Sequence, residues 1–335
     1  MKEVKKTMIL PVSIGTDLEG KHKQIDLGIG NALIAGCSGT GKSVLLNLIL
    51  IGLLKTETDF ILIDPKRVEL SQFDGVGNLL HPVIKNKLDV DSVLTWCCNE
   101  IERRYTVIEK DQFKNITDYN RVASEKFKHI VIAIDEFAEL SDEGKETTII
   151  KNLNKINAIA RAAGVHTVIS SQRPDAKVIS PKFKANIVYK IGLPVVSKVN
   201  SRVIIDQNGC EALKVGEFLI SEQGSEVRKC TFPKFPESEI SEYINRFKIG
   251  KPRFIKLSCK KIVEEKKKEK AAPKCKLFLI RDTLVTTTGT FFFKKKTQEL
   301  VYRTLRSINF SAKKFYFPFE LSILSANGIQ FSIKN

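Results

Sequence analysis

Apolar runs alternate with amphipathic stretches along most of the first 220 residues, and this pattern predicts alternating strands and helices. The run at 60–63 is continuously apolar, which is typical of strands buried in a parallel sheet. Other strands are expected at 32–35, 129–134 and 165–171, and two further candidate strands lie at 187–191 and 217–220. Strands separated by helices predict an α/β fold with a mostly parallel sheet and helices on both faces.

The segments between these runs predict three helices and a hairpin. The helix after Lys42 is apolar almost all round, so we expect it in the interior. A second helix is expected from about Ser92 to Ile108, with Asp91 as its cap. A third is expected to end at Gly164, and its apolar positions are Ile149, Leu153, Ile156, Ala160 and Ala163. Residues 9–30 alternate short apolar pieces with glycines and predict a lead-in hairpin.

The loop between the first buried strand and its helix carries the spacing G-x-x-x-x-G-K-S. Its glycines let backbone N–H groups point at a phosphate, and the helix N-terminus adds partial positive charge. In such a loop Lys42 reaches the terminal phosphates and the Ser43 hydroxyl holds Mg²⁺. The alternative is a chance glycine-rich turn, but the required strand–loop–helix context is present. The sequence therefore predicts a site for ATP or GTP formed by Gly36, Cys37, Ser38, Gly39, Thr40, Gly41, Lys42, Ser43 and Val44.

Polar residues follow three of the other predicted strands, at the edge of the sheet where ligands bind. Asp135 suits the Mg²⁺ shell, and Glu136 suits a base that orients and deprotonates the attacking water. The alternative for this pair is an exposed acidic strand end, which the phosphate loop outweighs. Gln172 is placed either to sense the γ-phosphate or to serve a structural role. Lys66 either belongs to this edge or is a surface charge on a solvated turn.

The net charge of +17 changes the picture only for the end of the chain. Residues 251–335 hold 20 Lys and Arg against 6 Asp and Glu, whereas residues 1–250 hold 35 against 32. Ten of the twenty Phe also lie after residue 250. Aromatic residues interleaved with lysines suit contact with nucleic acid, although a small accessory fold is the slightly favoured alternative.

Length and composition favour a cytoplasmic protein with one large domain and an appendage. The 335 residues contain no apolar run of 18, and the basic start is followed by too short an apolar run for a secretion signal. The seven cysteines show no C-x-x-C pair, so neither a zinc site nor a disulfide framework is expected. We divide the chain into a lead-in hairpin (1–30), a motor (31–250) and a small basic, Phe-rich C-terminal extension of uncertain fold (251–335).

Several segments beyond the phosphate loop carry a resemblance to a known family. They are IDPKRVELSQFDGVGNLLHPVI (63–84), WCCNEIERRY (96–105), VIAIDEFAEL (131–140), ARAAGVHTVISSQRPDAKVISPKFKANI (160–187) and SKVNSRVIIDQNGCEALKVGEFLI (197–220). Over roughly residues 9–250 the chain resembles the motor domain of the FtsK/SpoIIIE family, hexameric ATPases that pump double-stranded DNA through a ring. The resemblance implies a RecA-like P-loop NTPase that translocates double-stranded DNA as a ring-shaped homo-oligomer, in DNA segregation or transfer.

The resemblance also implies a role for each matching residue. The nucleotide is ATP, the metal ligands are Ser43 and Asp135, and the catalytic residues are Lys42, Glu136, Gln172 and Arg161. Arg161 resembles the arginine that one subunit supplies to the ATP of its neighbour, where it stabilises charge developing at the γ-phosphate. Its alternative role is a cation at a helix C-terminus, and both roles can hold together.

Departures from the family pattern leave other functions open. Members usually carry membrane helices and a second N-terminal motor subdomain, and often a winged-helix module, for which 255–335 show no convincing match. We therefore expect a version that is soluble or recruited by a membrane partner. One alternative is a secretion-type ring ATPase that moves protein. Another is a truncated ATP-binding relic, although Lys42, Asp135, Glu136 and Arg161 form an intact hydrolytic set.

Overall fold

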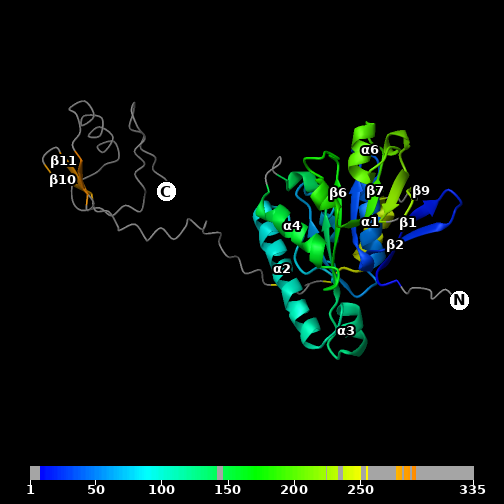
Figure 1. Ribbon diagram of the computed structural model, residues 1–335, viewed down its shortest axis with the longest axis horizontal. Coiled ribbons are helices and arrows are strands. Elements are labelled where there is room, and N and C mark those ends of the chain that lie inside the picture. Colours follow the sequence, from blue (N-terminus) through cyan, green and yellow to red (C-terminus); the bar gives the residue numbers. More distant parts are fainter. Residues whose placement is uncertain are drawn as a thin grey trace. The chain divides into compact units, whose positions relative to one another are not determined.

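A nine-stranded sheet forms the centre of the first of two units, Met1–Cys259, in the computed structural model of the chain (Figure 1). In spatial order its strands are β2 (His22–Asp26), β1 (Pro11–Asp17), β9 (Arg228–Thr231), β8 (Glu217–Glu222), β7 (Ile187–Gly192), β3 (Asn31–Ala35), β6 (Val165–Ser171), β5 (His129–Ile134) and β4 (Thr58–Ile63). Strands β7, β3, β6, β5 and β4 run parallel, and the other four pair antiparallel. The parallel part is the one predicted, and β9, which joins the hairpin to the sheet, was missed.

The structure describes residues 8–141, 146–223, 225–232, 237–249, 254–255, 277–280, 283–286 and 289–291. In the second unit, Lys260–Asn335, the short strands β10 (Leu277–Ile280), β11 (Thr283–Thr286) and β12 (Gly289–Phe291) form an antiparallel sheet. The charged stretch 256–276 and the aromatic and lysine residues of 292–319 lie outside the described residues. Within the described part of the chain, no helix is long and apolar enough to cross a membrane.

Helices cover both faces of the nine-stranded sheet (Figure 1). On one face lie α1 (Lys42–Leu53) and α7 (Glu237–Asn245), and on the other lie α2 (Lys87–Lys110), α4 (Thr148–Ile159), α5 (Pro181–Lys184) and α6 (Lys198–Ile205). The remaining short helices are α3 (Ile116–Val122), η1 (Leu27–Ile29), η2 (Ser71–Phe73), η3 (Phe137–Glu139) and η4 (Cys210–Ala212). This layering confirms the predicted α/β architecture.

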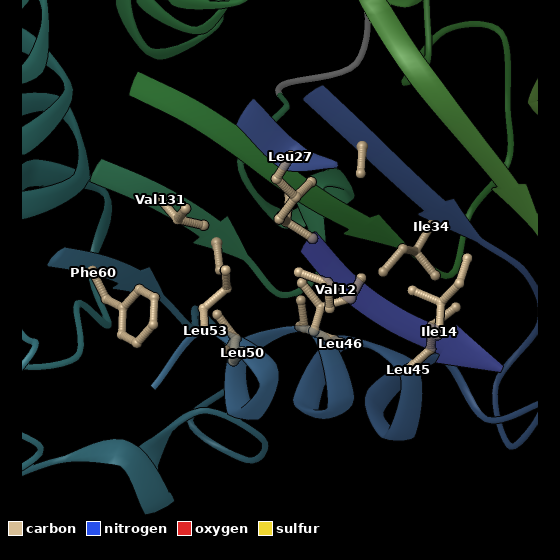
Figure 2. Close-up of a cluster of buried hydrophobic side chains, with 14 of the residues drawn as sticks. Val12, Ile14, Leu27, Ile34, Leu45, Leu46, Leu50, Leu53, Phe60 and Val131 are labelled. Atoms are coloured by element: carbon tan, nitrogen blue, oxygen red, sulfur yellow. The ribbon is translucent and has the colours of Figure 1, made fainter. Parts of the chain in front are cut away.

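Strand β3 is buried on both faces, which explains its unbroken apolar sequence. Ala32 and Ile34 face α1, whereas Leu33 and Ala35 belong to the core on the opposite face. Figure 2 shows leucines of α1 pointing at the sheet, toward Ile34 and the hairpin residues Val12 and Ile14. The hydrophobic packing of α1 under β3 and β1 therefore fixes the loop that joins β3 to α1.

Two helix ends differ from those predicted. Helix α2 begins at Lys87 because the Asn86 side chain accepts a hydrogen bond from the Asp89 amide at 2.9 Å, so Asp91 lies inside the helix. Helix α4 ends at Ile159, before Gly164. Gly164 has a φ of +70°, and a Cβ there would lie 2.7 Å from Cδ1 of Ile116. This glycine serves a tight turn and a close approach rather than the helix end.

A pair of stacked imidazoles lies in the core where β5 and β6 begin. His129 Nδ1 lies 3.0 Å from His166 Nε2, and His166 is fully buried. Burial, and to a lesser degree the nearby Arg104, lowers the pKa of His129 from 6.5 to about 4. Burial lowers the pKa of His166 well below its ordinary value. Both rings are therefore neutral in the folded protein at pH 7.

Acid should destabilise the fold through this pair. Below about pH 6.5 the unfolded chain binds protons that the folded chain does not, so the free energy of unfolding falls as the pH drops. For His129 alone the loss between pH 7 and pH 5 is about 2 kcal/mol. Urea unfolding at the two pH values measures it. The variant His129→Gln should lose less stability on acidification, and the exposed control His22→Gln should match the unmodified chain.

Candidate nucleotide site at the carboxyl edge of the sheet

The loop between β3 and α1 is held open as a cradle. Gly39 and Gly41 adopt φ values of +75° and +101°, and α1 begins directly at Lys42. The first N–H groups of a helix have no acceptor within that helix, so those of α1 are available to an anion. The amides of Gly36 and Cys37 instead donate to the carbonyls of Ser171 and Pro194 at 3.2 and 3.0 Å. The loop is therefore anchored at its start and free to bind at its end.

Gly41 is also the point where another part of the chain touches the loop. A Cβ at Gly41 would lie 2.1 Å from Cζ of Phe232, a half-buried residue that directly follows β9. The Phe232 ring stacks on Phe218 of β8 with centroids 6.1 Å apart. Glycine at this position is therefore required both by the backbone conformation and by the aromatic ring against it.

Lys42 and Asp135 form a buried ion pair across the site. Lys42 Nζ lies 3.7 Å from Oδ1 of Asp135, and the side chains are 3% and 2% exposed. The same oxygen accepts a hydrogen bond from the Ser170 hydroxyl at 3.0 Å. Burial raises the pKa of Asp135 above its ordinary value, and the positive charge of Lys42 partly offsets this. A further cation near this carboxylate would therefore stabilise its charged form.

Asp64 adds a second buried carboxyl group beside this pair. Its Oδ2 accepts a hydrogen bond from the Leu70 amide at 3.0 Å, and its charge contributes to the raised pKa of Asp135. Its Oδ1 is buried without a hydrogen-bond partner among the described residues. An orphaned carboxylate oxygen near Asp135 fits the oxygen ligands that Mg²⁺ prefers.

The Glu136 side chain points toward the end of β6, in a different direction from that of Asp135. Its φ of +65° is rare outside glycine and turns the chain sharply after β5. Its Oε1 accepts hydrogen bonds from the Ser171 hydroxyl at 3.3 Å and the Gln172 amide at 3.1 Å. Backbone strain of this kind costs about 1–3 kcal/mol and is concentrated at functional sites.

Lys66 lies in the site, which answers the question that the sequence left open. Its Nζ donates to Oε2 of Glu136 at 3.0 Å and to Oε1 of Gln172 at 3.2 Å. The predicted residues Lys42, Ser43, Asp135, Glu136 and Gln172 are thus brought together with Lys66 where β3, β4, β5 and β6 end. The DPK turn after β4 was the signal for Lys66.

Arg161 lies away from this group of residues. It follows α4 in the turn that leads into β6, and its Nη1 donates to the Ile29 carbonyl just before β3 at 3.3 Å. Arg161 lies just before β6 and Ile29 lies just before β3, and the opposite ends of these two strands carry the nucleotide site. The exposed Arg161 therefore occupies the amino edge of the sheet and does not face the phosphate loop of its own chain.

A cavity of about 410 Å³ opens beside the phosphate loop. Cys37 and Gln172 line it on the side of the site, and Arg173, Lys177 and Asn200 line it elsewhere. Sequence reasoning missed the last three, since only the QRP turn marks this segment. The cavity gives the site an open wall next to Gln172.

Comparison with known proteins identifies relatives of the chain. Residues 1–176 match the model of the FtsK/SpoIIIE family. A DNA translocase FtsK of Pasteurella multocida is 34% identical over 283 residues, which cover 74% of this chain and 30% of that protein. Another, of Haemophilus influenzae, is 36% identical over 250 residues, 64% of this chain and 47% of that protein. The chain spans less than half the length of these curated relatives.

Solved structures share the fold. The pCW3 conjugation coupling protein TcpA, in a monomer form with ATPγS, has a TM-score of 0.65 at 26% identity and covers 73% of this chain and 72% of its own. The cytoplasmic domain of the type VII secretion ATPase EccC of Thermomonospora curvata has a TM-score of 0.64 at 22% identity, covering 74% and 32%. The second likeness concerns the fold alone. Together they confirm the predicted RecA-like P-loop fold.

Alanine at Gly41 should damage the site more than alanine at Gly39. Both positions have positive φ, which costs an L-residue about 1–2 kcal/mol, but only Gly41 also meets the Phe232 ring. Overpacking adds about 1–3 kcal/mol for Gly41→Ala. Urea unfolding of the two single variants measures the difference, and the overpacking part of the Gly41→Ala cost should disappear when that change is made in a Phe232→Ala chain and compared with Phe232→Ala alone. Equal losses for the two glycines would show that the ring exerts no constraint.

Proposed function

This chain belongs to the FtsK/SpoIIIE family, and we propose that it hydrolyses ATP to move double-stranded DNA, as a ring of identical subunits in the cytoplasm. The observation that supports this most is the meeting of Lys42, Asp135, Glu136 and Gln172 at one edge of the sheet. A phosphate-binding cation and two acids with separate partners are what ATP hydrolysis requires. Segregation or transfer of DNA is the role that we propose.

The phosphate end of ATP would be held by the loop from Gly36 to Val44. The free amides at the start of α1 would donate hydrogen bonds to the phosphate oxygens, and Lys42 would neutralise their charge. Ser43 and Asp135 would hold Mg²⁺, which supplies positive charge to the β- and γ-phosphates when bound. The unpartnered Oδ1 of Asp64 is a further acceptor for this shell. Burial of Asp135 strengthens its attraction for a cation.

Glu136 is the residue that we propose as general base. Its carboxylate would accept a proton from the attacking water as the water oxygen bonds to the γ-phosphorus and the bond from that phosphorus to the leaving oxygen of ADP breaks. The backbone amide of Gln172 donates a hydrogen bond to the Glu136 carboxylate, and the Gln172 side chain reaches toward the space beside that carboxylate. Gln172 is therefore suited to sense whether the γ-phosphate is present and to transmit this to the end of β6.

Arg161 is proposed to act on the ATP of a neighbouring subunit. Its place at the amino edge of the sheet keeps it from its own site, and its exposure leaves it accessible to another copy. In a ring, the carboxyl edge of one subunit meets a different surface of the next, so each site can be completed in trans. This arrangement makes hydrolysis depend on assembly.

Duplex DNA should raise the rate of ATP hydrolysis by this chain. A steady-state ATPase assay at low salt, with and without duplex DNA, measures the effect, and a mass measurement on the same sample gives the assembly. Lys42→Ala should abolish hydrolysis, whereas Glu136→Gln should bind ATP and turn it over at least about a hundredfold more slowly. Indifference to duplex DNA at high protein concentration would refute translocation, and a larger response to protein substrates would favour a secretion motor.

Arg161→Ala should lower the rate of hydrolysis about a hundredfold or more while leaving ATP binding intact, because the arginine acts on developing charge. Lys151→Ala, which removes an exposed cation from α4, is the matched control and should retain the normal rate. Mixing Arg161→Ala with Lys42→Ala should restore part of the activity, since each protein supplies what the other lacks. Without such recovery, Arg161 would not act in trans.

A further inference from the structure

Lys66 connects two groups of the site that have separate tasks in hydrolysis. Its ammonium group bonds the Glu136 carboxylate at 3.0 Å and the Gln172 side-chain carbonyl at 3.2 Å. The Lys66 side chain is 33% exposed, whereas that of Glu136 is 1% exposed. Lys66 thus reaches from the protein surface into the buried end of the site.

The Glu136 carboxylate is fully engaged in the structure. Oε1 accepts from the Ser171 hydroxyl and the Gln172 amide, and Oε2 accepts from Lys66 and, at 3.3 Å, from the same amide. An ionised carboxylate offers about four acceptor positions, so these four contacts occupy it. A general base needs a free position within hydrogen-bond reach of the water. One of these contacts must therefore be released before Glu136 takes a proton.

The contact to Lys66 is the one that a ligand outside the protein can reach and release. Ser171 and Gln172 belong to the end of β6, where the Ser171 carbonyl also anchors the phosphate loop through Gly36. The turn that carries Lys66 is itself fixed, because the buried Asp64 carboxylate accepts the Leu70 amide at 3.0 Å. The Ser171 hydroxyl is buried, whereas the flexible four-carbon side chain of Lys66 is partly exposed and can swing outward.

We propose that Lys66 restrains the catalytic carboxylate until a backbone phosphate of the DNA substrate draws its ammonium group away. The proposal rests on the proposed function and deepens it, since it makes the DNA-free enzyme slow even with ATP bound. Lys66 lies at the exposed tip of its turn, and an ammonium group is a compact charge suited to phosphate. Lys66 keeps its proton throughout, and Glu136 alone accepts the proton of water. Lys66 is thus a positioning residue that acts through Glu136.

Removing the Lys66 charge should raise the DNA-free rate of ATP hydrolysis by the full chain. Release of one hydrogen bond to a charged group corresponds to about tenfold or more in a rate that it limits, so Lys66→Met should hydrolyse ATP about tenfold faster without DNA. Duplex DNA should then add little further stimulation. Lys66→Arg should stay slow without DNA because it keeps the ion pair. Arg67→Met, which removes an exposed charge from the same turn, is the matched control and should keep the slow DNA-free rate.

An unchanged or lower DNA-free rate in Lys66→Met would overturn the proposal, since Lys66 would then either be inert or assist the chemistry. Binding of ATPγS and a thermal melt establish that the variant is folded, and Lys66→Gln carries the same expectation if Lys66→Met does not fold. The outcomes separate this proposal from translocation itself. If the unmodified chain ignores DNA while Lys66→Met is faster, the restraint on Glu136 stands and the DNA substrate is refuted. If DNA stimulates both chains equally, translocation stands and the release of Lys66 by DNA is refuted.

Discussion

The buried contact between Lys42 and Asp135 is the interaction on which the rest of the site depends. Each charge would be costly to bury alone, and removing one partner of such a pair costs about 3–5 kcal/mol. The pair joins the start of α1 to the end of β5, so the phosphate loop and the carboxyl end of β5 are held in one arrangement. The free amides of α1 then define where an anion fits, and the unpartnered Oδ1 of Asp64 defines where a cation fits.

Adjacent acids serve different partners because the backbone turns between them. Asp135 follows the direction of β5 and meets Lys42, whereas the left-handed backbone of Glu136 directs its carboxylate to the end of β6 and Lys66. A straight strand would send the two side chains to opposite faces of the sheet. The strain at Glu136 keeps both acids at the same edge, where one can serve the metal and the other the water.

The two edges of the sheet carry different charged groups. The carboxyl edge carries the phosphate loop and both acids, and the amino edge carries Arg161. In the ring that we propose, a single chain would therefore hold a binding site that it does not complete. The hairpin is connected to the site through the sheet. Strands β1 and β9 extend the sheet, and Phe232, which follows β9, contacts Gly41.

The sequence by itself determined the parallel part of the sheet, the phosphate loop and the residues Lys42, Asp135 and Glu136, because apolar period and short-range spacing encode them. It misplaced the start of α2, since Asn86 and Asp91 are both plausible caps and only the hydrogen bond from the Asp89 amide identifies Asn86. It misplaced the end of α4, since Gly164 serves a turn that lies beyond Ile159. It left Lys66 undecided because an exposed lysine on a turn looks the same whether or not a carboxylate faces it. Only the tertiary structure set Lys66 against Glu136 and Arg161 at the far edge, because such contacts join strands distant in sequence.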